Sequence, residues 1–289
     1  MSTEVARVAL VTGGTSGIGM AAAKGLVAAG MHVVLLGRDS PRSRAARKTL
    51  AAGSPGSVID WIEADLRSQA SIRAAAEEFN SRFERLNVLI CAAGVFHKTR
   101  SETVDGIEST FAVNYLSHFL LSNLLAPALS RGAPSRVVFI ASRYGKNPID
   151  FEDLMVTKRK FTIMNSVPAT KLAEILLAQE LAERWQSEGV VVNAIHPGLV
   201  AHTHLLEEVG GFWQWMTNTF GHSPEKGADT AVWLATAPEA SGLTGKFFAN
   251  RRTLSTPGQG SDPAVRARLW TESLRLTHLE PAGPPAGQG

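Results

Sequence analysis

The chain has 289 residues, 44% of them hydrophobic and 19% charged, which is enough apolar material for one large core. Its formal net charge of +3 is too small for the basic face of a nucleic-acid-binding protein, so no nucleic-acid partner is expected. The single cysteine, Cys91, excludes an intrachain disulfide and suits a small core residue better than a reactive thiol.

Two segments bear on location. Met1–Ala6 lacks a basic stretch followed by an apolar run, so no secretory signal peptide is predicted. The longest apolar stretch, Phe119–Leu129, contains Ser122 and Asn123 and is far shorter than a bilayer span, so no stable membrane insertion is expected. We therefore expect a cytoplasmic protein.

Short runs rich in Val and Ile alternate along the chain with longer amphipathic segments. The short runs are predicted to be strands buried on both faces: Val5–Val11, His32–Leu36, Val58–Ile62, Val88–Ala92, Val137–Ala141 and Val190–Ile195. The longer segments are predicted to be helices: Gly17–Ala29, Arg42–Ala52, Ser71–Phe83, Gly106–Ser130 and Thr170–Ser187. This alternation predicts a Rossmann-like, doubly wound α/β fold of about seven parallel strands with helices on both faces.

After the sixth predicted strand the alternation breaks. Residues 199–223 are rich in aromatic side chains and are interpreted as a variable lid over a substrate, although a buried amphipathic helix explains the pattern equally well. A helix at Ser223–Thr236 and an edge strand at Lys246–Phe248 follow. Residues 1–280 are predicted to form a single domain, and residues 281–289 a disordered tail of Pro, Gly, Ala and Gln.

The first predicted strand runs directly into a glycine-rich turn, Thr12–Gly19, that opens the first helix. Glycines in such a turn let backbone N–H groups approach a pyrophosphate at the helix N-terminus. The turn therefore predicts a dinucleotide site, with contacts from Gly13, Thr15, Ser16, Gly17, Ile18 and Gly19.

With its G-x-x-x-G-x-G spacing, this turn resembles that of the short-chain dehydrogenase/reductase family, and the similarity covers roughly residues 5–276. Within the family the chain is most similar to the retinol-dehydrogenase-like branch. The segments that carry this likeness are Asn114–Leu121, Lys171–Ala173, His196–Gly198, Gly245–Phe248 and Arg268–Trp270.

The second predicted strand is followed by Gly37 and Arg38. An acidic residue there would bind the ribose hydroxyl of NAD, whereas an arginine suits the 2′-phosphate of NADP, so NADP(H) is the expected cofactor. The resemblance implies further cofactor contacts at Asp65, Leu66, Ala93, Gly94, Lys171, Pro197, Gly198, Val200 and Thr203.

The resemblance also implies catalytic roles. Ser142 would hold and polarise the substrate oxygen, Lys171 would bind the nicotinamide ribose and lower the pKa of a neighbouring acid, and Asn114 would support a water in a proton relay. That acid is a tyrosine four residues before the lysine, but this chain has Val167 there. The implied activity is an NADP-dependent oxidoreductase acting on the carbonyl or alcohol of a bulky apolar substrate.

Three interpretations of Val167 remain open at this point. The valine is an engineered substitution, or a natural variant in which Tyr144 acts instead, or the mark of a site that binds the dinucleotide without redox turnover. A non-redox enzyme that uses the same pocket is an intermediate possibility between an oxidoreductase and a protein that only binds the dinucleotide. No metal site is predicted, since His202 and His204 lack an acidic or cysteine partner at ligand spacing. The resemblance further suggests a homodimer or homotetramer, paired through the helices that carry Asn114 and Lys171.

Overall fold

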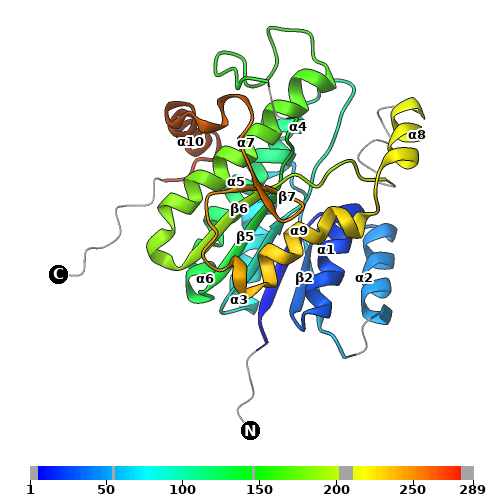
Figure 1. The fold of residues 1–289 in the computed structure, drawn as a ribbon. Coiled ribbons are helices and arrows are strands. Elements are labelled where there is room, and N and C mark those ends of the chain that lie inside the picture. Colours follow the sequence, from blue (N-terminus) through cyan, green and yellow to red (C-terminus); the bar gives the residue numbers. More distant parts are fainter. Residues whose placement is uncertain (1–5, 54–55, 145–146, 202–210, 281–289) are drawn as a thin grey trace, which may run out of the picture.

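The computed structural model describes residues 6–53, 56–144, 147–201 and 211–280, with the backbone alone for 212–216. The central sheet has eight strands in the order β3-β2-β1-β4-β5-β6-β7-β8 (Figure 1). Their bounds are β1 Val8–Thr12, β2 His32–Gly37, β3 Ile59–Glu63, β4 Val88–Cys91, β5 Ser135–Ile140, β6 Val190–Ile195, β7 Phe247–Ala249 and β8 Arg252–Leu254. The predicted Rossmann-like, doubly wound fold is confirmed.

The count of about seven parallel strands needs one correction. The strands from β3 to β7 pair in parallel, but β8 pairs antiparallel with β7. Asn250 and Arg251 join the two strands, and both have positive φ (48° and 59°), as a tight two-residue hairpin turn requires. A three-residue strand is too short to show a period of two in the sequence.

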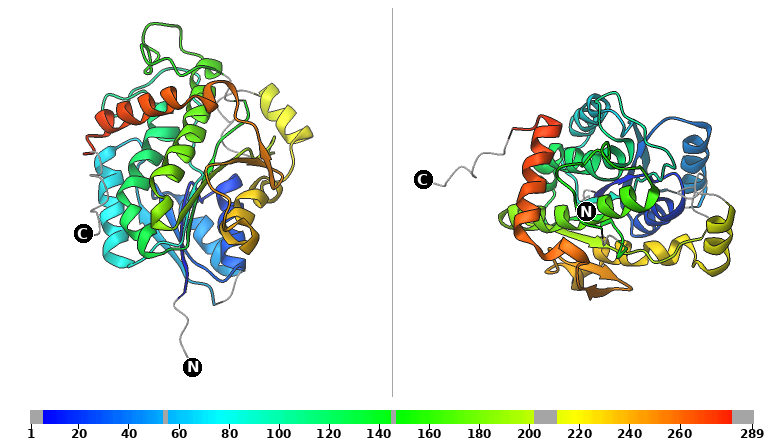
Figure 2. Two further views of the ribbon diagram at one scale, coloured as in Figure 1. Left: turned by 60° about the vertical axis from the view of Figure 1, so that its left-hand side comes forward. Right: turned by 90° about the horizontal axis from the view of Figure 1, so that it is seen from above.

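The strands are buried because helices cover both faces of the sheet. In β1, Leu10 faces one hydrophobic core, while Ala9 and Val11 face the other. The first core contains residues of α3 (Gln69–Arg82), α5 (Ser117–Leu124) and α7 (Ile163–Arg184). The second contains residues of α1 (Gly17–Ala28), α2 (Pro41–Gly53) and α9 (Pro224–Thr236), which lie on the opposite side of the sheet (Figure 2).

The single helix predicted at Gly106–Ser130 is divided in the structure. It consists of α4 (Ser109–Phe111), a π-helical turn at Ala112–Leu116, α5, and α6 (Ala126–Arg131). Pro127 lies in the first turn of α6 and has no N–H to donate to the preceding turn, which explains the interruption near Leu125. The π-helical turn contains Asn114, and such turns often occur at functional sites.

Helix α7 begins at Ile163, well before the predicted start at Thr170. Thr162 and Asn165 form a capping box at its N-terminus. Pro168 lies inside the helix and cannot donate to the carbonyl of Met164, but Asn147 Nδ2 donates to that carbonyl instead (2.5 Å). The proline is therefore accommodated without ending the helix.

Helix α10 (Pro263–Thr277) was not predicted; Asp262 caps it by accepting the N–H groups of the first turn. This helix packs on α5, where the Trp270 ring lies 5.0 Å from that of Phe119, and on the π-helical turn before α5, where Ser273 bonds the hydroxyl of Tyr115 (2.8 Å). Oligomerisation through the helices that carry Asn114 and Lys171 stays a prediction.

Candidate cofactor and active site

The topological switch point of the sheet lies between β1 and β4, where ligands bind to doubly wound folds. Thr12 ends β1 and is fully buried. Its Oγ1 accepts the N–H groups of Ala92 (3.0 Å) and Ala93 (3.1 Å), which follow β4. The threonine therefore fixes the segment after β4 against the start of the glycine turn.

Two glycines of the turn, Gly13 and Gly19, have no room for a side chain. Gly13 has a φ of +67°, and a Cβ there would lie 2.7 Å from the Cα of Ala93. A Cβ on Gly19 would lie 2.4 Å from the carbonyl oxygen of Gly13. Ser16 precedes α1 but makes no capping hydrogen bond, which leaves the first N–H groups of the helix for another acceptor.

Arg38 directly follows β2, the strand that lies beside β1 in the sheet. The register pairs Thr12 with Leu36, so Arg38 begins two residues beyond the level of the glycine turn. Its side chain is exposed and makes no hydrogen bond or ion pair with any other residue that the structure describes. The adjacent Asp39 is paired with Arg44, so the nearest carboxylate is already neutralised.

Asp65 and Leu66 follow β3, farther out along the same edge. The Asp65 carboxylate accepts the N–H of Arg67 (3.0 Å), and its own N–H donates to Ser71 Oγ (2.9 Å). Leu66 is buried. These bonds hold the start of α3 but bring neither residue into contact with the catalytic candidates.

Asn114 is fully buried and reaches the segment after β4. Its Oδ1 accepts the N–H of Val95 (2.7 Å), and its Nδ2 donates to the Val95 carbonyl (3.1 Å) and to Thr170 Oγ1 (3.4 Å). These bonds hold Val95, next to Ala93 and Gly94, against the turn that carries Asn114, and they leave one lone pair of Oδ1 unused.

Ser142 lies two residues beyond β5, partly exposed, and its Oγ accepts the N–H of Tyr144 (3.2 Å). The ring of Tyr144 is 59% exposed and packs edge-on against His196, with ring centroids 5.5 Å apart. Among the described residues, no hydrogen bond joins the Tyr144 hydroxyl to Ser142 or Lys171. The structure therefore gives no support to Tyr144 as a replacement acid.

Lys171 is buried on α7, one turn after the buried Val167. Its Nζ donates to the carbonyl of Ile140 (2.8 Å) and to Oε2 of Glu174 (2.8 Å). The bond to Ile140, two residues before Ser142, brings the lysine to the end of β5. One ammonium hydrogen remains for a ligand.

The segment after β6 closes the site. Burial, and then the charges of Arg143 and His222, lower the pKa of His196 to about 4, so its ring is neutral near pH 7. Gly198 has a φ of +81°, and a Cβ there would lie 2.3 Å from Nε2 of His222. Thr203 lies outside the described residues, as do His202 and His204.

Gly227 of α9 joins this segment to the glycine turn. A Cβ on Gly227 would lie 2.8 Å from a methyl group of Val200, 3.4 Å from Ile18 and 3.5 Å from the carbonyl of Pro197. Together with the contacts above, this packing brings most predicted site residues into one ring at the carboxyl edge of the sheet. Arg38, Asp65 and Leu66 lie at its outer side.

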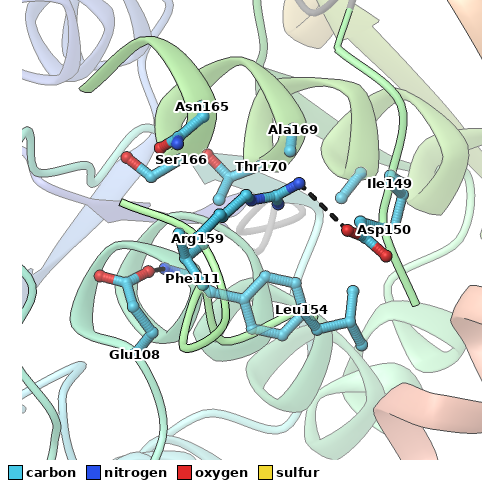
Figure 3. A pocket seen from close by; sticks show the side chains of 12 residues that line it. Glu108, Phe111, Ile149, Asp150, Leu154, Arg159, Asn165, Ser166, Ala169 and Thr170 are labelled. Atoms are coloured by element: carbon cyan, nitrogen blue, oxygen red, sulfur yellow. Dashed lines mark hydrogen bonds and ion pairs between the residues drawn. The ribbon is translucent and has the colours of Figure 1, made fainter. Parts of the chain in front are cut away.

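A small pocket lies beside the first turns of α7, and Figure 3 shows the side chains that line it. Its polar groups already have partners: Arg159 bonds Asp150 (3.1 Å), Glu108 caps α4, and Thr170 Oγ1 donates to the Val167 carbonyl (2.8 Å). None of the predicted site residues lines it, so we assign it no function.

Two further observations concern the described residues. In that part of the chain, no three His, Cys, Asp or Glu side chains are grouped so that they could hold a metal ion. Across the same residues, no helix has the length and apolar character that crossing a membrane requires.

Three buried side chains beside the site were not predicted: Thr12, His118 and Glu174. Glu174 lies three residues after Lys171, a spacing that puts two side chains on one helix face and could have suggested the pair. Nothing in the local sequence pattern indicates that His118 contacts Thr12, 106 residues earlier.

Comparison with known proteins agrees with this geometry. A family model described as short chain dehydrogenase matches residues 7–211. The chain is 36% identical to retinol dehydrogenase 13 of Mus musculus, over 100% of this chain and 89% of that protein. Two solved structures resemble the fold with a TM-score of 0.67: the Pseudomonas aeruginosa RhlG/NADP active-site complex (27% identical; 85% of this chain, 94% of that one) and a Burkholderia cenocepacia short chain dehydrogenase with NADP (26%; 84% and 95%).

Proposed function

Because the chain belongs to the short-chain dehydrogenase family, we propose that it is an NADP(H)-dependent oxidoreductase acting on the carbonyl or hydroxyl group of a bulky apolar molecule. The observation that carries the proposal is the glycine turn held against Ala93, with the unpaired Arg38 at its outer side. Two structural relatives were solved with NADP, which supports the same cofactor class.

The residues of this edge fit a phosphorylated dinucleotide. The uncapped start of α1 suits a pyrophosphate, and the Gly13 turn lets it approach the backbone. Arg38 suits the 2′-phosphate, while Asp39, which could serve an unphosphorylated ribose, is already paired with Arg44. A bound nicotinamide would supply or accept the hydride.

In this proposal Ser142 holds and polarises the substrate oxygen, and Lys171 uses its remaining ammonium hydrogen for the nicotinamide ribose. Asn114 positions the segment that follows β4. Val167 carries no proton, and a general acid contributes about 10²–10⁴ in rate. We therefore expect slow turnover from the chain as it stands.

Exposed apolar side chains support a bulky apolar substrate. Tyr144 follows β5, Leu199 follows β6, and Phe220 ends α8 (Gly211–Phe220); they are 59%, 38% and 70% exposed. Tyr144 and Leu199 belong to segments that leave the carboxyl ends of neighbouring strands, where the catalytic candidates lie. Apolar groups at the mouth of a site favour apolar ligands.

The second candidate is a protein that binds NADP(H) without redox turnover. It is favoured by the buried Val167 and by the Tyr144 ring, which is turned to His196 rather than to Ser142. The two candidates share the cofactor site and differ only in whether hydride is transferred.

Calorimetry tests the cofactor first. We expect NADP⁺ to bind more tightly than NAD⁺, and Arg38→Gln to weaken NADP⁺ by about 10- to 100-fold, since a charge-assisted hydrogen bond contributes about 1.5–3 kcal/mol. Arg85→Gln is the matched control, because Arg85 is exposed and precedes β4 at the opposite edge. No heat with either dinucleotide at millimolar concentration would refute both candidates.

Absorbance of the reduced nicotinamide then separates the candidates. Steady consumption of NADPH by the unmodified chain, with a panel of apolar ketones and aldehydes, excludes binding without turnover. Val167→Tyr is expected to turn over faster. A Val167→Tyr protein that binds NADPH yet reduces nothing in the panel would contradict the oxidoreductase proposal.

A further inference from the structure

Buried polar side chains connect Lys171 to Thr12 through Glu174 and His118. Glu174 lies one turn after Lys171 on α7 and is fully buried. Its Oε2 accepts from Lys171 Nζ (2.8 Å), and its Oε1 faces Nδ1 of His118 at 3.4 Å. The far side of the His118 ring contacts Thr12 Oγ1 (3.2 Å).

The hydrogen-bond partners fix the direction of this network. Thr12 Oγ1 already accepts two backbone N–H groups, those of Ala92 and Ala93, so its own proton is left for Nε2 of His118. An imidazole that accepts at Nε2 carries its proton on Nδ1, toward Glu174. His118 Nδ1 and Glu174 Oε1 are both buried without a hydrogen bond, and each lies within ion-pair distance of the other.

Three groups face Glu174 from the elements around it. On its own helix it faces the Lys171 ammonium, and from α5 it faces the His118 ring. From β4 it acts on Cys91, where burial and then the Glu174 carboxylate raise the pKa of the thiol and keep it protonated. Among these neighbours, the Lys171 ammonium is the group that donates a hydrogen bond to the Glu174 carboxylate.

We propose that Glu174 is a positioning residue that acts as the internal counter-ion of Lys171, and so removes the positive charge that would activate an acid at position 167. The inference rests on the proposed function, because it concerns the lysine of that site. It makes Val167 and Glu174 two coupled features: the acid is missing, and the lysine next to it is already neutralised.

The geometry sets the size of the effect. Position 167 lies seven residues before Glu174, which is about 10 Å along a helix at 1.5 Å per residue. A unit charge at about 10 Å, with an effective dielectric constant of about 20, shifts a pKa by about one unit. Removing the carboxylate charge should therefore make a phenol at 167 more acidic by about one unit.

The test titrates tyrosinate absorbance in Val167→Tyr and in Val167→Tyr/Glu174→Gln, each as the full chain without cofactor or substrate. Subtracting the titration of the unmodified chain removes Tyr115 and Tyr144. We expect the phenol introduced at position 167 to have a pKa about one unit lower in the double variant. Val167→Tyr/Glu183→Gln is the matched control, because Glu183 lies on the same helix but is 66% exposed and far from Lys171.

An unchanged or higher phenol pKa in the Glu174→Gln double variant would overturn the proposal. Since no cofactor or turnover is involved, this outcome is distinct from failure of the proposed function. If Val167→Tyr does not fold, urea unfolding of Lys171→Met, Glu174→Gln and their combination decides instead. The proposal expects the combination to unfold at higher urea than Lys171→Met, and simple additivity would contradict it.

Discussion

Lys171→Met should destabilise the protein in a way that depends on pH. The substitution keeps the apolar stem but leaves the fully buried carboxylate of Glu174 without its cation. Removing one partner of a buried ion pair costs about 3–5 kcal/mol. The carboxylate can limit this cost by taking up a proton, which makes the loss depend on the proton concentration.

The free-energy cost of keeping Glu174 protonated is estimated from the usual pKa of a glutamate side chain, about 4.3. Holding that proton at pH 7 costs about 2.7 units of 1.36 kcal/mol, or about 3.7 kcal/mol, whereas at pH 5 it costs about 1 kcal/mol. The folded variant then binds more protons than its unfolded chain, so its stability falls as pH rises above about 4.3.

Urea unfolding at pH 5 and pH 7 measures this difference against the unmodified chain at each pH. Lys171→Met/Glu174→Gln is the control, because it loses the same hydrogen bond to Ile140 but has no carboxylate. We expect its unfolding free energy to show no such pH dependence. A Lys171→Met loss that is equal at both pH values would refute the buried counter-ion.

Three further outcomes are expected. Because the pKa of His196 is lowered to about 4, its neutral ring stabilises the fold above about pH 6.5, and this stability is lost as the pH falls toward about 4. In urea unfolding, His196→Gln should remove up to about 3 kcal/mol of this loss of stability in acid. An unchanged dependence of the unfolding free energy on pH would count against this prediction. Gly13→Ala should abolish NADP⁺ heat in calorimetry, since its Cβ would lie 2.7 Å from Ala93; binding at the original affinity would disprove the tight turn. Trp270→Ala should cost about 3–5 kcal/mol by removing the contact of α10 with Phe119, and a loss below about 1 kcal/mol would show that α10 packs loosely.

The parallel sheet and the helices on both of its faces could be anticipated, because the alternation of short apolar runs with amphipathic segments is a local pattern. A run such as Val190–Ile195 is apolar on both faces, which is typical of a strand inside a parallel sheet. Errors arose where local signals were weak or misleading. Pro168 hid the first turns of α7, since the partner that replaces its missing N–H, Asn147, comes from a separate loop.

Some residues of the candidate site could likewise be predicted from the sequence, and others could not. The glycine turn and Arg38 were visible because their residue types are unusual at those positions. The structure adds contacts of Asn114 that the sequence did not indicate, since its amide bonds Val95 and Thr170. It also added Glu174 and His118, which no motif had indicated.

By itself, the sequence determined the alternating elements, the turn that opens the first helix, and the valine before Lys171. These features depend on residues that are neighbours along the chain. Only the tertiary structure decided which polar groups meet: His118 with Thr12 across 106 residues, and Asn114 with Val95. Such contacts depend on strand order and on the packing of helices on the sheet, which local spacing does not specify.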